Sequence, residues 1–237
     1  LGAVSVKRKS SDLTEFYIQF LIVVYLLWSF PVLSFGQKEV LVPADGTVSE
    51  GEEQPVVALT FDDGPSGTST PVLLEGLRKR GVRATFFVIG EKAEQNPELI
   101  CRMSEEGHLI GNHTYSHVQL NMLSSSQACS QVKAANDVIK EITGQEVIYL
   151  RPPYGEWDHK KDCPQNMIAV YWDVDPLDWK RTDTKQIAAD ILRQVKPGDI
   201  ILLHDIYKTS VQAAFIVIDE LQRQGYEFVT VEELLFA

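Results

Sequence analysis

Basic residues are scarce in this chain of 237 residues, which has 22 Lys and Arg against 33 Asp and Glu and a net charge of −11. Proteins that bind DNA or RNA phosphates need the opposite balance, so nucleic acid is excluded as a partner. The same charge gives no attraction to anionic lipid. Any membrane association must therefore come from an apolar segment rather than from the folded surface.

Cysteine is also rare, and the sequence shows no internal repeat or low-complexity tract that would indicate a solenoid. The three cysteines, Cys101, Cys129 and Cys163, cannot all pair within one chain, and none stands in a CxxC spacing. Zinc sites and thiol redox motifs of the common kind use that spacing. We therefore interpret the three cysteines as structural.

One long apolar run is present near the beginning of the chain. Lys7, Arg8 and Lys9 precede an almost uninterrupted apolar stretch from Phe16 to Phe35. This pattern is typical of an export signal, and residues 1–36 are predicted to be a cleaved signal peptide or an N-terminal membrane anchor. A buried core helix is disfavoured because the run has no polar face. The basic flank predicts that the rest of the chain is extracytoplasmic.

The remainder of the chain is predicted to be an exposed linker, residues 37–54, followed by one domain from residue 55 onward. The linker contains Gly, Glu, Pro and Ser without a hydrophobic period. After it, short apolar runs alternate with amphipathic ones. The predicted strands are Val56–Phe61, Ala84–Ile89, Leu109–Gly111, Val147–Arg151, Ile168–Val174, Ile200–Leu203 and Glu227–Val231.

Helical periodicity fills the gaps between these strands. Three helices are the clearest. One follows Ser124 and ends at Gly144, the second follows Thr184, and the third follows Thr209 or Ser210. Strand and helix alternation predicts a parallel α/β sheet, and seven strands favour a distorted or incomplete (β/α)7-type barrel. A doubly wound open sheet is the alternative.

Unusual polar residues occur just after the predicted strands. They are Asp62 and Asp63, His113 and His117, Arg151 and Tyr154, Asp175 and Trp179, and His204. The carboxyl ends of parallel barrel strands share one rim, where active sites of such folds lie. These separate positions are therefore expected to converge.

Each motif is weak when it is taken singly. The Asp62-Asp63-Gly segment is a common turn, and isolated histidines with the spacing of His113 and His117 are more often surface or core residues. Together, two imidazoles and the Asp63 carboxylate form a ligand set for Zn²⁺ or another divalent ion such as Co²⁺. This set leaves positions open for water and substrate.

The other polar residues fit acid–base hydrolysis beside such an ion. Asp62 is free to act as a base on metal-bound water. Arg151 can hold a carboxylate by paired hydrogen bonds. His204, on a different strand end, can supply the proton that a leaving amine requires.

Five segments together resemble the successive motifs of the NodB-type polysaccharide deacetylases, carbohydrate esterase family 4. They are TFDDGP at 60–65, NHTYSH at 112–117, RPPYG at 151–155, DPLDW at 175–179 and LLHD at 202–205. The resemblance covers residues 55–237. It implies that this span is a catalytic domain with the distorted (β/α) barrel fold, which uses a divalent ion to hydrolyse an acetyl group on a sugar.

The resemblance also implies roles for individual residues. Asp62 is the general base, held by Arg151, while Asp63, His113 and His117 bind the metal. His204 is the general acid, oriented by Asp175. The backbone N–H of Tyr154 holds the oxyanion, and Trp179 and Leu202 wall the acetyl pocket. Asp178 belongs to the fourth motif but is given no chemical step.

The expected substrate is an N-acetylated cell-wall glycan, with N-acetylglucosamine in peptidoglycan favoured over chitin oligomers and acetylated xylan. A monomer is expected, with membrane contact only through the N-terminal segment. A non-catalytic glycan-binding wall protein is the rival from another class. It predicts loss of the base or the acid, yet Asp62 and His204 are both present.

Overall fold

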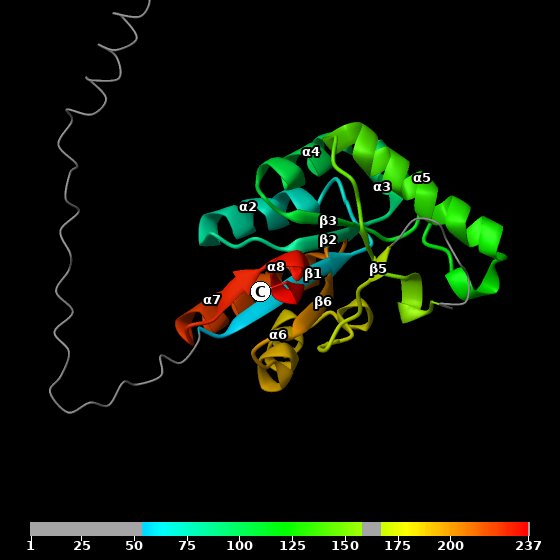
Figure 1. Cartoon of the computed structure of the whole chain (residues 1–237). Helices are drawn as coiled ribbons and strands as arrows, with labels where there is room; N and C mark the ends of the chain where they lie inside the picture. Colours follow the sequence, from blue (N-terminus) through cyan, green and yellow to red (C-terminus); the bar gives the residue numbers. More distant parts are fainter. Residues whose placement is uncertain (1–53, 158–166, 237) are drawn as a thin grey trace, which may run out of the picture. The chain divides into compact units, whose positions relative to one another are not determined.

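The structure is a computed structural model that describes residues 54–157 and 167–236. The predicted export segment, nearly all of the predicted linker, and Cys163 lie outside these residues. Within them, strands and helices alternate along the chain as expected (Figure 1). No helix in this part of the chain is both long and apolar enough to cross a membrane.

Each predicted strand position holds a strand, although the fourth and fifth strands are only two residues long. The strands are β1 Val56–Asp62, β2 Thr85–Val88, β3 Leu109–Asn112, β4 Tyr149–Leu150, β5 Ile168–Ala169, β6 Ile200–His204 and β7 Glu227–Val229. The helices are α2 Thr70–Arg80, α3 Gly90–Gln95, α4 Pro97–Glu105, α5 Ser125–Thr143, α6 Thr184–Gln194, α7 Lys208–Arg223 and α8 Val231–Leu235. Short 3₁₀ turns are η1 Leu120–Met122, η2 Pro153–Gly155 and η3 Asp178–Lys180.

Local capping explains where several elements begin and end. Ser124 and Gln127 form a reciprocal capping box at the start of α5, and Gly144, with a φ of 72°, ends it as predicted. The carboxylate of Asp183 caps α6, one residue before the predicted start, and α7 begins before either residue predicted to cap it. The predicted last strand is shorter because Thr230 caps α8.

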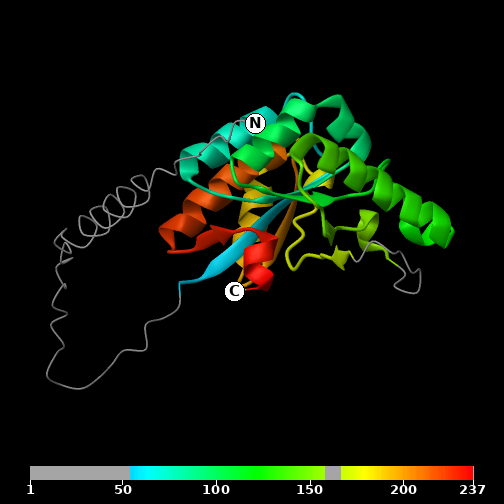
Figure 2. The same cartoon turned by 45° about the horizontal axis from the view of Figure 1, so that its top comes forward.

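All strand pairs are parallel, in the order β5-β4-β3-β2-β1-β6, with β7 beside the start of β1. The segment predicted as one strand, 168–174, instead touches both edges of the sheet. Its beginning pairs with β4, and Val174 pairs with Ile201 of β6. One segment thus joins the two edges, so the sheet is an incomplete barrel, as predicted, rather than an open doubly wound sheet. Helices α2 to α5 lie along one side of it (Figures 1 and 2).

Alternation along β1 separates an outer apolar layer from the barrel interior. Leu59 and Phe61 belong to the main core against the helices, whereas Ala58 belongs to a smaller interior cluster. The next positions on the interior side are Thr60 and Asp62, both buried. The interior therefore changes from apolar to polar toward the carboxyl end of β1, where the predicted site begins.

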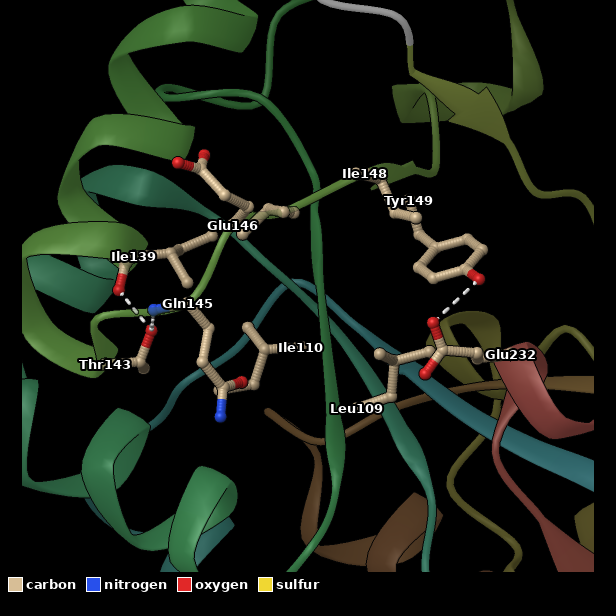
Figure 3. Close-up of a pocket in the computed structure, with 10 residues that line it drawn as sticks. Leu109, Ile110, Ile139, Thr143, Gln145, Glu146, Ile148, Tyr149 and Glu232 are labelled. Atoms are coloured by element: carbon tan, nitrogen blue, oxygen red, sulfur yellow. Dashed lines mark hydrogen bonds between the residues drawn. The ribbon is translucent and has the colours of Figure 1, made fainter.

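A cavity of about 310 Å³ lies near the start of β3 and β4, between α5 and α8 (Figure 3). In its lining, the hydroxyl of Tyr149 donates a hydrogen bond to the carboxylate of Glu232 at 3.1 Å. Burial and this carboxylate raise the pKa of Tyr149 to about 12. None of the predicted site residues lines this cavity.

Candidate active site

A second cavity, of about 360 Å³, lies at the opposite end of the strands, where the predicted motifs meet. It is lined by Asp62, Asp63, His113, His117, Pro152, Tyr154, Trp172, Asp175, Trp179, Leu202, His204 and Tyr207. Every site residue predicted from the sequence is among these except Arg151, which is fully buried. The expected convergence of strand ends is thus what the fold produces.

Asp63, His113 and His117 form a compact group at one side of this cavity. Oδ1 of Asp63 lies 3.1 Å from Nε2 of His117 and 3.4 Å from Nε2 of His113. One potential ligand atom from each residue lies within 4.8 Å of the others. Asp63 reaches this position with a φ of 70°, a left-handed conformation that aspartate tolerates better than most residues.

The two imidazoles are oriented by groups behind them. Nδ1 of His113 lies 2.7 Å from the carbonyl oxygen of Arg151, to which it donates as the Nδ1–H tautomer. Nε2 then carries a lone pair toward Asp63. Nδ1 of His117 faces the hydroxyl of Tyr154 at 3.5 Å, so its Nε2 also points to Asp63. Such backing is the usual arrangement for metal-binding histidines.

These residues fit a divalent ion by an independent criterion. Oδ1 of Asp63 is buried and accepts no hydrogen bond from any residue that the structure describes. Burial acts to raise the pKa of Asp63, but in the metal-free protein the facing imidazoles of His113 and His117, where they carry a proton, lower it, and the net direction is downward. An ionised, unsatisfied carboxylate oxygen between two imidazole nitrogens is the donor set that Zn²⁺ takes in open sites.

Asp62 is held from behind by the buried Arg151. Nη1 of Arg151 lies 2.9 Å from Oδ1 of Asp62 and donates also to the hydroxyl of Thr60 at 2.6 Å. The other carboxylate oxygen, Oδ2, lies 3.8 Å from Nε2 of His113, on the side of the metal group. Asp62 thus has one oxygen fixed by a cation and one directed at the cavity.

The Arg151 guanidinium also contacts segment 168–174 where the pairing of that segment with β4 ends. Nε and Nη2 donate to the carbonyl groups of Val170 and Tyr171 at 3.3 and 3.0 Å, and the guanidinium carbon lies 4.2 Å from the Phe87 ring centroid. Burial lowers the pKa of Arg151, and the charge of Asp62 opposes this. The residue that holds the proposed base is therefore also part of the barrel closure.

His204 is oriented by Asp178, and the prediction that Asp175 orients it is wrong. Oδ1 of Asp178 lies 2.8 Å from Nδ1 of His204, and its Oδ2 accepts the backbone N–H of His204 at 2.9 Å. Asp175 instead accepts the backbone N–H of Leu177 at 2.8 Å. Leu177 has a φ of 55°, and this turn places the fully buried Asp178 side chain against the imidazole.

The same contact sets the charge of His204. Burial acts to lower its pKa, but the hydrogen bond and charge of Asp178, with the charges of Asp62 and Asp63, raise it to about 9. His204 is therefore protonated at neutral pH. An imidazolium at the edge of the cavity is suited to donate a proton to a leaving group.

A clamp that the sequence did not indicate holds the turn after β1. Nζ of Lys92 in α3 donates to the carbonyl of Asp63 at 2.7 Å. Asp205, fully buried, accepts a hydrogen bond from Thr70, and a Cβ on Gly64 would lie 2.3 Å from its oxygens. Burial raises the pKa of Asp205 to about 7. Asp205 stands in the LLHD motif, which could have drawn attention to it, whereas nothing in the sequence singles out Lys92.

Comparison with known proteins places these motifs in a family. A family model described as polysaccharide deacetylase matches residues 49–171. The peptidoglycan-N-acetylmuramic acid deacetylase PdaC of Bacillus subtilis is 41% identical over 193 residues, which cover 81% of this chain and 41% of PdaC. The peptidoglycan-N-acetylglucosamine deacetylase PgdA of Listeria monocytogenes is 38% identical over 178 residues, 75% of this chain and 38% of PgdA. This chain thus spans about two fifths of these curated relatives.

Solved structures agree with the same assignment. A structure of PdaC from Bacillus subtilis has a TM-score of 0.75 at 42% identity and covers 77% of this chain and 91% of that one. BA3943 from Bacillus anthracis, described as a pseudoenzyme of the CE4 family, has a TM-score of 0.72 at 29% identity and covers 77% of this chain and 66% of that one. The fold is therefore found in both active and inactive proteins, and activity depends on the residues of the site.

Proposed function

Because this chain belongs to the polysaccharide deacetylase family, we propose that it is a metal-dependent hydrolase that removes acetyl groups from N-acetylglucosamine units of a cell-wall polysaccharide, most directly peptidoglycan. The observation that carries this proposal is the convergence, around one cavity, of a three-residue metal group, a separate carboxylate and an imidazolium. The names of the relatives support the substrate class, since they are peptidoglycan deacetylases.

The metal group and the separate carboxylate of the cavity each have a task in amide hydrolysis. Asp63, His113 and His117 would hold the ion, for which Zn²⁺ is proposed, and such an ion would polarise the acetyl carbonyl and increase the acidity of water. Asp62 accepts the proton of the attacking water through the oxygen that faces the cavity, while Arg151 keeps its other oxygen fixed.

The acid and the substrate contacts lie on the other parts of the cavity wall. His204, protonated and oriented by Asp178, delivers a proton to the departing amine nitrogen, so that acetate and a free amino sugar leave. We assign the backbone N–H of Tyr154 to the oxyanion and the side chains of Trp179 and Leu202 to the acetyl group. Both side chains line the cavity, which is consistent with this assignment.

The substrate and the cellular location form part of the same proposal. An enzyme of peptidoglycan must act outside the cytoplasm, which agrees with the basic cluster and apolar run expected to direct export or anchoring in residues 1–36. The folded domain is proposed to act as a monomer. Chitin oligomers and acetylated xylan are the alternative substrates of the same chemistry.

Acetate release tests the proposal. The purified full chain, in mild detergent and with added zinc, is incubated in parallel with peptidoglycan, chitin oligomers and acetylated xylan. Release from peptidoglycan with appearance of free amino groups is expected. Faster release from chitin oligomers or xylan would change the substrate, and no release from any of the three by a folded, zinc-loaded protein would favour a glycan-binding role instead.

A further inference from the structure

Tyr207 lies on the cavity wall, beside the general acid, and has no role in the reaction described so far. It immediately precedes α7 and is 38% exposed. Its ring centroid lies 6.3 Å from that of His204, and the two ring planes make an angle of 64°. Among residues 54–157 and 167–236, nothing forms a hydrogen bond with its hydroxyl.

The start of α7 does not use the hydroxyl of Tyr207. This residue occupies the N-cap position of α7, yet its side chain makes no capping hydrogen bond, so the helix does not depend on its hydroxyl. A half-exposed aromatic ring with an unused hydroxyl, set into the wall of a polar cavity, is a group suited to bind a ligand that has both apolar and hydroxyl surfaces.

The direction of the proposed reaction places the sugar near this ring. His204 protonates the amine nitrogen that remains attached to the sugar, so the sugar must lie on the His204 side of the scissile bond. Tyr154 occupies the opposite side, where its ring centroid lies 5.0 Å from that of His117. Tyr207 therefore lies on the acid side of the cavity, and Tyr154 lies on the metal side.

On the basis of the proposed function, we propose that Tyr207 is a specificity residue that binds the sugar ring carrying the scissile acetamido group. Its ring packs on the apolar C–H surface of the sugar, and its hydroxyl donates to a sugar oxygen. Burial and the charges of Asp63 and Asp178 raise the pKa of Tyr207, which keeps the hydroxyl in its donating form. The residue thereby favours acetylated sugars over acetyl compounds that lack a sugar.

Two substrates separate sugar binding from chemistry. An N-acetylglucosamine tetramer contains the sugar, whereas 4-nitrophenyl acetate offers only an acetyl group to the same catalytic residues. For Tyr207→Ala in the full chain, we expect the KM for the tetramer to rise about tenfold, the effect of losing one aromatic contact and one hydrogen bond. The rate with 4-nitrophenyl acetate should stay within about twofold of wild type.

Tyr207→Phe keeps the ring and removes only the hydroxyl, so it separates the aromatic contact from the hydrogen bond. It should raise the KM for the tetramer by a smaller factor than Tyr207→Ala. Phe236→Ala removes an exposed aromatic ring outside the cavity and should change neither the KM for the tetramer nor the rate with 4-nitrophenyl acetate. Zinc content and the melting temperature are measured for each variant. A loss confined to kcat, or equal losses with both substrates, would assign Tyr207 to catalysis or folding and overturn the proposal.

The wild-type protein distinguishes this proposal from the one on which it rests. If wild type releases acetate from the tetramer and Tyr207→Ala does so with unchanged KM, the specificity role is wrong while the deacetylase function stands. If wild type cleaves 4-nitrophenyl acetate but no acetylated glycan, the proposed function fails, and the role of Tyr207 fails with it.

Discussion

Replacing Asp178 by Asn tests how the proposed general acid keeps its proton. In the native protein, Asp178 and the nearby acids raise the pKa of His204 from 6.5 to about 9 against the effect of burial. This rise corresponds to a preference of about 3 kcal/mol for the imidazolium. In Asp178→Asn the pKa should fall to about 6.5, so that about a quarter of the molecules carry the proton at pH 7.

The titration is followed by NMR of the His204 ring in metal-free protein, beside the pH dependence of deacetylation. The midpoint for His204, and the pH above which activity is lost, should both move down by about 2.5 pH units in Asp178→Asn. Asp175→Asn is the matched control, because its carboxylate contacts the Leu177 N–H and not the imidazole. A His204 that still titrates near pH 9 in Asp178→Asn, or whose pKa falls in Asp175→Asn, would refute the role of Asp178.

The same change has a consequence for stability. Since the folded-state pKa of His204 lies above its unfolded value, its contribution to stability is complete below pH 6.5 and is lost as the pH rises through about 9. The free energy of unfolding of metal-free wild type should therefore fall by up to about 3 kcal/mol more than that of Asp178→Asn between pH 6 and 9.5. Urea unfolding at the two pH values measures this difference.

Three further predictions concern the clamp, the buried cation and the cysteines. Lys92→Met should weaken zinc binding about tenfold or more in a chelator competition, because the Asp63 carbonyl loses its donor. Arg151→Met should lower the free energy of unfolding by about 3–5 kcal/mol in urea, because it leaves the Asp62 carboxylate buried without its cation. Arg78→Met, which breaks an exposed pair, should cost less than about 1 kcal/mol. Joint replacement of all three cysteines by Ser should preserve zinc binding and activity, and a folded variant that binds zinc without turnover would contradict their structural role.

The convergence of the site was predictable from the sequence because it depends on few facts. Parallel strands bring their carboxyl ends to one edge, and Asp62, His113 and His204 each stand at or just after such an end. The alternation along β1 also decides that Asp62 faces the interior. No contact between distant side chains is needed for either inference.

The partner of His204 could not be derived in this way. Asp175 and Asp178 lie three residues apart in a loop without hydrophobic period, and the choice between them depends on the left-handed conformation of Leu177 and on the bond between Asp175 and its N–H. The contact of Lys92 depends similarly on how α3 packs against the turn after β1. Both features are set by tertiary structure rather than by local pattern.

The interrupted strand after β4 has a comparable cause. The sequence of segment 168–174 predicts one continuous strand, yet the carbonyl groups of Val170 and Tyr171 accept hydrogen bonds from Arg151 instead of from another strand. A side chain from a distant motif thus replaces part of the sheet pairing. Strand propensity cannot reveal that side-chain hydrogen bonds take the place of strand pairing, because it describes only local preference.

The central claim is that Asp63 binds the metal while the adjacent Asp62 accepts the proton of water. Zinc content measured beside the rate of acetate release tests this claim most directly. Asp63→Ala should lose zinc and activity together, because it removes one of three protein ligands. Asp62→Asn should retain zinc but lose about 10²-fold or more of the rate, since an amide cannot accept the proton of water. A zinc-free Asp62→Asn beside a zinc-loaded Asp63→Ala would reverse the two roles, and full activity in Asp62→Asn would contradict the mechanism.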